Sequence, residues 1–578
     1  MNIALAQINV NVGDFEKNAL KILNFSWEAY RSGADVIVFP ELALCGYPPE
    51  DLLLKKSFIS EQMETLNKLI SGLPDCLILL GCAYPEKNAL YNSAAIIYKK
   101  EFVSFYKKIN LPNYGVFDEK RYFNAGNEPL VLQINSATIG IQICEDIWIE
   151  DSVTEAESFL GDAEIIINLS SSPYHLGKGS LRIETIRKMA RKVKSEIYYC
   201  NLVGGQDELV FDGESIVVNE DGDLILKGEK FKEDLIIHSS DSNSLCKKRF
   251  NDLDFKERKK NFSTNLQIKT IKLEKMELNK NKIEKGKLKK ISENISQEEE
   301  VYNALKLGLY DYVKKNGFEK VIFGLSGGID SALAALIAMD TLGSENVNCL
   351  FMPSRFTSKE SYQDAYKIAE NLKINLIEIS IEETFKAFLE VLKAHFYKFP
   401  ANETEENIQA RIRGLILMAF SNKFGYLVLS TGNKSEYSVG YCTLYGDMVG
   451  GFALLKDVPK TLVYKLVRWR NQKESFSLIP ERVIERPPTA ELKENQKDQD
   501  TLPPYDLLDE IIHLYIEEDL STAEIIQRGF EKEIVEKVVK AIDKAEYKRR
   551  QAPPGIKITP KAFGKDRRMP ITHKYILS

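Results

Sequence analysis

Residues 321–331, Val-Ile-Phe-Gly-Leu-Ser-Gly-Gly-Ile-Asp-Ser, predict the fold of the second half of the chain. The apolar start is typical of a buried strand, the glycine-rich middle of a tight turn, and the following run, Ala332–Met339, of a helix. Backbone N–H groups and the positive end of a helix dipole then converge on one spot, which suits a phosphate. There is no Gly-Lys-Ser/Thr ending, so this is not a Walker A loop, and an ordinary strand-to-helix turn is the alternative.

The turn contains the groups that a polyphosphate needs. Ser326 and Ser331 can donate hydrogen bonds, Gly327 and Gly328 allow close approach of the backbone, and Asp330 can hold a metal that bridges phosphate oxygens. The spacing Ser-Gly-Gly-x-Asp-Ser resembles the pyrophosphate loop of ATP pyrophosphatases, which adenylate a substrate and release pyrophosphate. The resemblance implies AMP-forming chemistry without naming the substrate.

The segments around this turn predict a parallel sheet. Strand-like runs recur at 348–352, 375–379 and 426–430, and they are separated by single helical runs such as Val301–Lys315 and Glu405–Phe420. Strands joined by single helices form right-handed crossovers in a parallel sheet, whose ligands lie at the carboxyl ends of the strands. Ser326 falls at such an end.

The N-terminal half alternates short apolar strands with amphipathic helices, which predicts an α/β layer domain. From about residue 243 the chain becomes rich in Lys, Asn and Glu, with basic runs at 247–249, 256–260 and 280–290. A basic run can bind nucleic acid, but this one carries almost no interleaved aromatics, so a solvated connector is the preferred interpretation. We predict a first domain at 1–242, a connector at 243–296 and a second domain at 297–578.

The composition excludes several classes of protein. The 578 residues are 44% hydrophobic and 28% charged, with a net charge of −6, so no overall field attracts nucleic acid or anionic membranes. The eight cysteines include no Cys-x-x-Cys pair, which argues against a zinc site or a disulfide framework. No apolar run is long enough to span a bilayer, and there is no leader-like N-terminus. We expect a cytoplasmic enzyme of several domains, with neither nucleic acid nor membrane as a partner.

Three reactive side chains follow strand-like runs of the N-terminal half: Glu41, Lys108 and Cys144. A thiol at a strand-to-helix turn can act as a nucleophile if a base and an oxyanion stabiliser lie near it, and a carboxylate and a lysine can supply these. Each residue alone has an ordinary alternative: a small core cysteine, a carboxylate at a helix start and a solvated lysine. Their joint placement favours catalysis.

Longer motifs around these residues resemble the glutaminases of the nitrilase superfamily. The stretches are Pro40-Glu41-Leu42 with residues 46–51, residues 108–123, and Gln142-Ile-Cys144-Glu-Asp-Ile-Trp. A nitrilase glutaminase joined to the Ser-Gly-Gly-Ile-Asp-Ser loop is similar to the glutamine-dependent NAD synthetases, from residue 3 to about 575. The resemblance implies an α/β protein: a nitrilase-like αββα sandwich followed by a doubly wound parallel-sheet ATP pyrophosphatase domain.

The resemblance also implies roles for individual residues. Glu41 is the implied general base, Lys108 the oxyanion stabiliser and Cys144 the nucleophile that forms a glutamyl thioester. The implied glutamine-binding residues are Tyr114, Ser172 and Lys178. The implied ATP-binding residues are Gly324, Leu325, Ser326, Gly327, Gly328, Ile329, Asp330, Ser331 and Thr431. The implied deamido-NAD-binding residues are Asn407, Arg411, Glu436 and Lys548. The implied metal ligands are Asp330 and Glu436.

Lys548 and the segment 447–460 each have an ordinary alternative. Lys548 lies in a basic C-terminal segment that is otherwise expected to be solvated. Residues 447–460 resemble a mobile loop over the substrate, and a plain surface loop is the alternative.

The implied reaction hydrolyses glutamine and uses the ammonia to amidate deamido-NAD through an acyl-adenylate. ATP is a co-substrate, Mg²⁺ the metal, and no organic prosthetic group is expected. The chain is expected to form a symmetric homo-oligomer.

The alternative function is another glutamine-dependent, AMP-forming amidotransferase. An asparagine synthetase needs an N-terminal cysteine, but residue 2 is Asn2. A GMP synthetase uses a Cys-His-Glu glutaminase, but the histidine closest in sequence to Cys144 is His175. A binding protein on a decayed enzyme scaffold is a further alternative, against which the motifs are intact. A tRNA-modifying enzyme is another, but aromatic residues arranged to stack on RNA bases are not evident.

Overall fold

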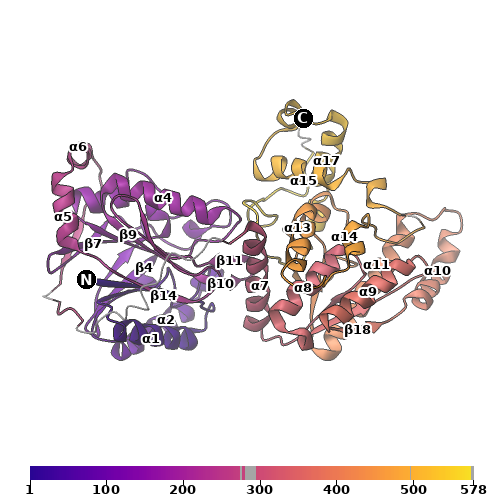
Figure 1. Ribbon diagram of the computed structural model, residues 1–578, viewed down its shortest axis with the longest axis horizontal. Coiled ribbons are helices and arrows are strands. Elements are labelled where there is room, and N and C mark those ends of the chain that lie inside the picture. Colours follow the sequence, from indigo (N-terminus) through magenta and orange to yellow (C-terminus); the bar gives the residue numbers. More distant parts are fainter. Residues whose placement is uncertain (274–275, 280–294, 495, 575–578) are drawn as a thin grey trace. The chain divides into compact units, whose positions relative to one another are not determined.

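The computed structural model describes residues 1–273, 276–279, 295–494 and 496–574 (Figure 1). These residues form two compact units. The first contains Met1–Gln206 and the described residues from Val210 to 279. The second contains Asp207–Leu209 and the described residues from Ile295 onward.

The first unit is built on two sheets. One has the strand order β14-β1-β2-β3-β4-β5: Asp234–Ser239, Asn2–Gln7, Val36–Val38, Leu77–Glu86, Ala89–Tyr98 and Glu101–Lys107. The other has the order β13-β12-β9-β8-β7-β6-β15: Leu224–Lys227, Ile216–Val218, Glu196–Asn201, Ile165–Ser170, Ala137–Ile143, Leu130–Ile134 and Lys269–Lys272. The central strands β1, β2 and β3 are parallel, as are β7, β8 and β9, so their carboxyl ends lie at one edge of each sheet.

Side chains from both sheets form a single core, so the sheets pack face to face. Leu5, Val38 and Leu79 from the first sheet share this core with Ile141 and Ile167 from the second. Helices α1 (Phe15–Arg31) and α2 (Lys56–Gly72) lie along the outside of one sheet, and α4 (Lys178–Val193) covers the outside of the other (Figure 1). The unit is therefore an αββα sandwich, as predicted.

Residues 242–272 differ from the expected solvated connector. They contain α5 (Ser242–Asn251) and α6 (Leu253–Asn261), and strand β15 pairs in parallel with β6. Phe255 is buried and its ring lies 5.6 Å from that of Phe159, while the buried Arg249 donates a 2.9 Å hydrogen bond to the carbonyl of Ser158. Scattered apolar residues thus anchor a charged segment to the sandwich. The basic run at 280–290 lies outside the described residues.

The second unit contains one parallel sheet. Its strand order is β18-β17-β16-β19-β20: Asn375–Glu378, Val347–Phe351, Val321–Gly324, Leu427–Ser430 and Phe452–Ala453. The chain moves outward from β16 in one direction and then returns to its other side with β19, so the topology reverses between β16 and β19. Ligands of doubly wound sheets bind at such a switch point, beyond the carboxyl ends of the strands.

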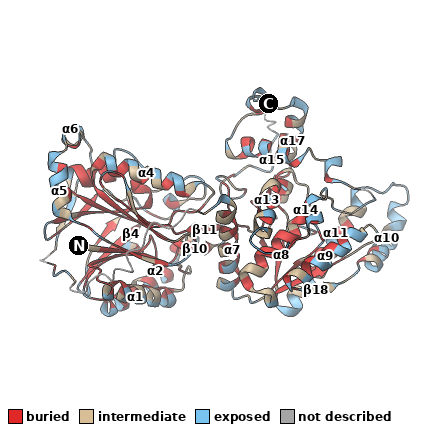
Figure 2. Cartoon of the chain, viewed as in Figure 1, coloured by how far each residue is buried: buried red, intermediate tan, exposed pale blue. Residues whose placement is uncertain are grey.

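Helices complete the second unit around this sheet. They are α7 (Gln297–Lys315), α8 (Ile329–Leu342), α9 (Lys359–Leu372), α10 (Glu382–Phe396), α11 (Glu403–Phe424), α12 (Lys434–Val439) and α13 (Lys460–Asn471). A C-terminal helical layer with α15 (Tyr505–Ile512) and α17 (Lys532–Lys544) has its own apolar core. Within each unit, buried residues concentrate on the strands and on the inner faces of the helices (Figure 2).

Residues 447–460 are not an open loop over the sheet. They contain the strand β20, and residues 452–458 are all buried. The expectation of a mobile loop is therefore wrong for most of this segment, because its apolar side chains, such as Phe452 and Leu454, form part of the packed interior. None of the helices in the described part of the chain is long and apolar enough to cross a membrane.

Two candidate catalytic sites

Cys144 lies where β7 ends and the short 3-10 helix η3 (Cys144–Ile147) begins. Its φ of 42° is in the left-handed region, which non-glycine residues adopt at a cost of about 1–3 kcal/mol. The residue is 5% exposed. Such a strained turn persists only when neighbouring groups hold it, and it presents the thiol at the carboxyl end of the central strands.

Glu41 follows β2 in a turn that packs against Gly81 of β3. A Cβ atom on Gly81 would lie 2.2 Å from the carbonyl oxygen of Pro40, so only glycine lets the turn approach this closely. Glu41 is fully buried, and its carboxylate accepts hydrogen bonds from Asn92 Nδ2 at 2.7 Å and from the backbone N–H of Ser171 at 3.0 Å. The turn thereby holds a carboxylate in the interior.

Lys108 follows β5 and is also fully buried. Its Nζ lies 2.7 Å from Glu41 Oε1 and 2.9 Å from Glu119 Oε1. Burial acts to lower the pKa of Lys108, but the carboxylates of Glu119 and Glu41 outweigh it and hold the pKa well above its usual value. The ammonium group is therefore charged at neutral pH.

Burial, and next the carboxylate of Glu41, raise the pKa of Cys144 well above its usual value, while Lys108 acts in the opposite direction. The thiol is consequently protonated in the free protein at neutral pH. To attack a substrate it must give up a proton, and Glu41 is a carboxylate close enough to influence its ionisation. The cluster therefore places a thiol, a carboxylate and a fixed cation together, which is a set of groups suited to nucleophilic catalysis.

Glu119 is a member of this cluster that sequence reasoning missed. Besides Lys108, the hydroxyl of Tyr47 donates to its Oε1 at 3.2 Å, and its Oε2 has no hydrogen-bond partner among the described residues. Glu119 occurs within the quoted motif at 108–123, but the position of an acidic residue in a motif does not show that its side chain is buried. Only the fold brings it to Lys108.

The three predicted glutamine-binding residues have different surroundings. The hydroxyl of Tyr114 lies 3.0 Å from both carboxylate oxygens of Glu145, the residue after Cys144. Lys178 begins α4, with its Nζ 4.2 Å from the centre of the Trp148 ring. Ser172 is buried, and its backbone N–H donates to Asn201 Oδ1 at 2.9 Å. Tyr114 and Lys178 each interact electrostatically with Cys144, so both lie near the thiol.

The second site begins at the turn between β16 and α8, where the phosphate loop was predicted. Ser326 and Ser331 hydroxyls lie 3.2 Å apart, and the backbone N–H of Gly328 donates to Ser326 Oγ at 3.2 Å. Gly327 has a φ of 83°, and a Cβ atom there would lie 2.5 Å from the carbonyl oxygen of Ser361. The predicted turn is therefore a compact loop that only glycine can close.

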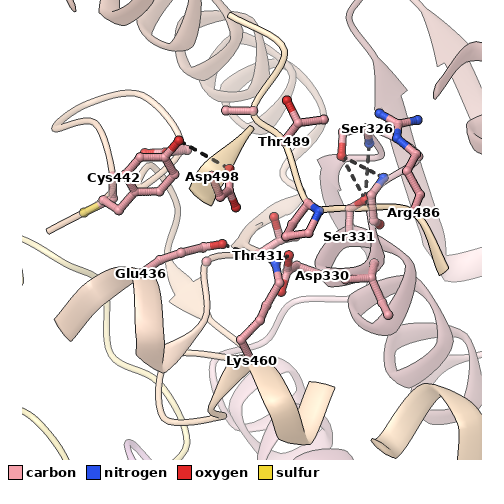
Figure 3. Close-up of a pocket in the computed structure, with 18 of the residues that line it drawn as sticks. Ser326, Asp330, Ser331, Thr431, Glu436, Cys442, Lys460, Arg486, Thr489 and Asp498 are labelled. Carbon is pink, nitrogen blue, oxygen red and sulfur yellow. Dashed lines mark hydrogen bonds and ion pairs between the residues drawn. The ribbon is translucent and has the colours of Figure 1, made fainter. Parts of the chain in front are cut away.

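Two adjacent cavities open at this loop, at the switch point of the sheet. One of about 190 Å³ is lined by loop residues 326–331 together with residues from four other segments, including Thr431, Glu436, Lys460, Thr489 and Asp498 (Figure 3). The other, of about 260 Å³, is lined mainly by apolar residues such as Met352, Leu417 and Leu429. Ser326, Thr431, Asp447 and Ala490 line both cavities, which form one continuous candidate site.

Opposite charges meet on the wall of the smaller cavity. The ammonium of Lys460 forms an ion pair with Asp330 and lies 3.5 Å from Glu436 Oε1, as Figure 3 shows. Asn433 Nδ2 donates to Asp330 Oδ1 at 2.9 Å. Burial, followed by the charge of Asp330, raises the pKa of Glu436. Sequence reasoning found both carboxylates but gave Lys460 no role, since Lys460 is 130 positions from Asp330.

Residues Asn407, Arg411 and Lys548 do not line the smaller cavity. The hydroxyl of Thr443 donates to Asn407 Oδ1 at 2.7 Å, and Arg411 Nε donates to the carbonyl of Leu444 at 3.2 Å. Lys548 Nζ donates to the carbonyls at 440 and 442, both at 2.7 Å. All three therefore contact the segment 440–444, of which Tyr441 and Cys442 line the cavity.

The two predicted metal ligands are the carboxylates of Asp330 and Glu436. In the described part of the chain, no three His, Cys, Asp or Glu side chains are grouped to hold a metal by themselves. Asp330 and Glu436 nevertheless direct two carboxylates at one position, now faced by the Lys460 ammonium. Mg²⁺ is usually bound by one or two carboxylates together with substrate phosphates, so this pair fits it.

Comparisons with known proteins agree with the two sites. Residues 2–249 match the carbon-nitrogen hydrolase family, and residues 301–552 match the NAD synthase family. The chain is therefore an amide-hydrolysing domain joined to an NAD synthase domain. It is 48% identical over 577 residues to a glutamine-dependent NAD(+) synthetase of Aquifex aeolicus, with 100% of both chains covered. It is 46% identical to one of Thermotoga maritima, covering 100% of this chain and 99% of that one.

A solved structure extends this likeness to the fold. The glutamine-dependent NAD(+) synthetase from Acinetobacter baumannii in complex with ADP is 41% identical, with a TM-score of 0.75 over 99% of this chain and 98% of that one. The chain belongs to the glutamine-dependent NAD(+) synthetase family.

Proposed function

We propose that this protein makes NAD from deamido-NAD, ATP and glutamine, releasing AMP, pyrophosphate and glutamate. One observation carries the proposal. A single chain, 48% identical over its whole length to a glutamine-dependent NAD(+) synthetase, contains both the Cys144 cluster and the loop at 326–331. The first is suited to amide hydrolysis and the second to a nucleoside triphosphate. The presence of one site does not explain the presence of the other, whereas a reaction that uses both sites does.

In the first half-reaction, the sulfur of Cys144 attacks the side-chain amide carbon of glutamine while Glu41 accepts the thiol proton. Lys108 donates to the oxyanion that forms. Glu41 then passes the proton to the leaving nitrogen, so ammonia departs and a thioester remains, which water hydrolyses to glutamate. Tyr114, Ser172 and Lys178 hold the substrate, with the ammonium of Lys178 suited to the α-carboxylate.

In the second half-reaction, the loop at 324–331 binds the phosphates of ATP and the larger cavity receives the adenosine. The carboxylate of deamido-NAD attacks the α-phosphorus and pyrophosphate leaves, which gives an acyl-adenylate. Ammonia attacks the acyl carbon, AMP departs, and the amide of NAD is formed. Thr431 lies where the two cavities meet and faces ATP. Asn407, Arg411, Glu436 and Lys548 are assigned to deamido-NAD. Asn407, Arg411 and Lys548 would act through the segment 440–444, whose residues Tyr441 and Cys442 line the smaller cavity.

Asp330 and Glu436 are the residues that would hold Mg²⁺. When bound, the ion would neutralise charge on the phosphate oxygens. Lys460 has its ammonium beside both carboxylates and balances their charge. The pKa of Glu436 is raised, so a second cation beside this carboxyl group would stabilise its ionised form.

The two halves belong together because the attacking nitrogen must be neutral. Free ammonia is mostly ammonium near pH 7, and ammonium has no lone pair for attack. Ammonia made in a buried site and passed on within the protein stays unprotonated. This requirement explains why an amide hydrolase and an adenylating synthetase share a chain.

The test is conversion of deamido-NAD to NAD with ATP, supplied either with glutamine or with high ammonium. We expect Cys144→Ala to abolish the glutamine reaction and to keep the ammonium reaction, with Cys82→Ala, another buried cysteine of the same unit, as the control. Asp330→Asn should lose both syntheses by orders of magnitude and keep glutamine hydrolysis. Loss of both syntheses in folded Cys144→Ala, or no NAD from the unaltered protein, would refute the proposal.

A further inference from the structure

Asp146 is a fully buried carboxylate that the reaction described above does not use. It lies in η3, directly beyond the strained turn at Cys144. Four donors converge on it, and they come from two separate parts of the chain.

One carboxylate oxygen holds the segment after Lys108. Asp146 Oδ1 accepts the backbone N–H of Asn110 at 2.8 Å and that of Ile109 at 3.3 Å. These are the two residues that immediately follow Lys108. Strand β5 ends at residue 107, so these hydrogen bonds fix the path of the backbone beyond the strand. They thereby fix the position of the Lys108 side chain.

The other oxygen holds the strand ends themselves. Asp146 Oδ2 accepts the backbone N–H of Ile143 at 3.0 Å and the hydroxyl of Tyr106 at 2.7 Å. Ile143 precedes the nucleophile, and Tyr106 lies near the end of β5. A single side chain thus connects the turn that carries Cys144 with residues on both sides of Lys108.

The ionisation of Asp146 supports this role. Burial raises its pKa to about 6, and the hydrogen bonds from Asn110, Tyr106 and Ile143 counteract part of that effect. The group is therefore mainly ionised at neutral pH, and an ionised carboxylate accepts all four bonds without donating any. Hydrogen bonds to a charged acceptor are stronger than those between neutral groups.

We propose that Asp146 is a positioning residue for glutamine hydrolysis, which fixes the Cys144 turn and the Lys108 strand end relative to each other. This proposal rests on the proposed function of the Cys144 cluster. Lys108 can stabilise the oxyanion only if its Nζ lies close to the carbonyl oxygen while the sulfur attacks the same carbonyl carbon. Misplacement by about 1 Å can reduce the rate roughly 100-fold, so a tie between these two elements has a large effect on turnover.

The first variant is Asp146→Asn, which keeps the shape but replaces one acceptor oxygen by an amide that donates. If the NH₂ faces Ile143, two N–H donors meet and this hydrogen bond is lost. We expect kcat for glutamine hydrolysis to fall on the order of 100-fold while KM for glutamine stays within about threefold, because glutamine-binding residues are untouched. Alkylation of Cys144 by iodoacetamide should change in rate as well. Ammonium-dependent NAD synthesis should be unchanged.

Two further variants keep the test decisive. Tyr106→Phe removes one of the four donors and should cause a smaller fall in kcat, again without a change in KM. Glu164→Gln is the matched control, because Glu164 is a buried carboxyl group that accepts the backbone N–H of Thr138 at 2.9 Å, toward the other end of β7. It should leave glutamine hydrolysis near that of the unaltered protein.

The proposal is overturned if Asp146→Asn and Glu164→Gln reduce kcat equally, or if KM rises in step with the fall in kcat. If Asp146→Asn loses ammonium-dependent synthesis through misfolding, Tyr106→Phe decides the question: unchanged kcat in that variant overturns the proposal. An unaltered protein that hydrolyses no glutamine would instead refute the function assigned to the Cys144 cluster, so the two failures are distinguishable.

Discussion

At the scale of single residues, the Cys144 cluster shows how neighbouring charges control a nucleophile. Burial and the carboxylate of Glu41 raise the pKa of the thiol, while the ammonium of Lys108 acts against them. The resting protein therefore keeps a neutral thiol beside a carboxylate that accepts hydrogen bonds from Lys108 and Asn92. A neutral thiol is less reactive than a thiolate, so under the proposed function proton transfer to Glu41 accompanies attack on the substrate.

Glu41→Gln should separate two effects of one carboxylate. Removing the negative charge removes a cause of the raised thiol pKa, so the pH at which iodoacetamide alkylates Cys144 should fall. Glutamine hydrolysis should nevertheless be lost, because the proton acceptor is gone. The measurement is the rate of Cys144 alkylation from pH 6 to 10, followed by peptide mass spectrometry.

The exposed Cys246 serves as an internal reference in this experiment, and Glu164→Gln again serves as the control variant. Both should have the same alkylation profile as in the unaltered protein. A Glu41→Gln profile that stays in place or moves to higher pH would contradict the electrostatic role given to Glu41.

At the scale of structural elements, the strand-to-helix turn at 324–331 is closed by contacts to another helix. The φ of 83° at Gly327 is one requirement for glycine, and the nearby carbonyl of Ser361, in α9, is a second and independent one. Gly317 has a similar φ of 77°, but a Cβ atom there would meet no atom within 4 Å. The two glycines thus differ mainly in the space around them.

Gly327→Ala and Gly317→Ala form a matched pair. Both should lose about 1–2 kcal/mol of stability from the left-handed backbone conformation. Only Gly327→Ala should also displace the phosphate loop, so its NAD synthesis should fall on the order of 100-fold with either nitrogen source. Urea unfolding measures the first effect, and synthesis from ammonium measures the second. Equal activities in the two variants would mean that the contact with Ser361 is unimportant.

At the scale of the whole molecule, one chain contains two α/β units whose sites require different chemistry. The first site is closed and organised around a thiol, and the second opens into cavities of about 190 and 260 Å³. We propose that copies of the chain assemble into a closed symmetric oligomer and that ammonia passes between the sites without entering bulk water. Closed symmetry is the usual arrangement of identical chains.

Both parts of this proposal can be measured. Sedimentation at micromolar concentration should show a species larger than 65.8 kDa, the mass of one chain. An ammonium-consuming enzyme added during glutamine-driven synthesis should leave the yield of NAD unchanged, whereas it should suppress synthesis from free ammonium. A fully active monomer would refute the assembly, and strong inhibition of the glutamine reaction would refute the enclosed path.

The sequence by itself predicted much of this protein, wherever the determining signal is local. Apolar runs bounded by turn residues located the central strands to within a few residues, because burial and backbone sterics act over short stretches. The glycine pattern at 324–331 predicted a phosphate loop for the same reason. Quoted motifs indicated the family and supplied Glu41, Lys108 and Cys144.

Only the tertiary structure decided which distant side chains meet. The pairing of Glu119 with Lys108, of Lys460 with Asp330 and Glu436, and of Asp146 with Asn110 depends on which segments lie side by side. It also decided that residues 242–272 pack on the sandwich and that 452–458 are buried. The physical reason is that hydrogen bonding and desolvation depend on distances of a few ångströms between segments, and the order of residues along a chain does not state those distances.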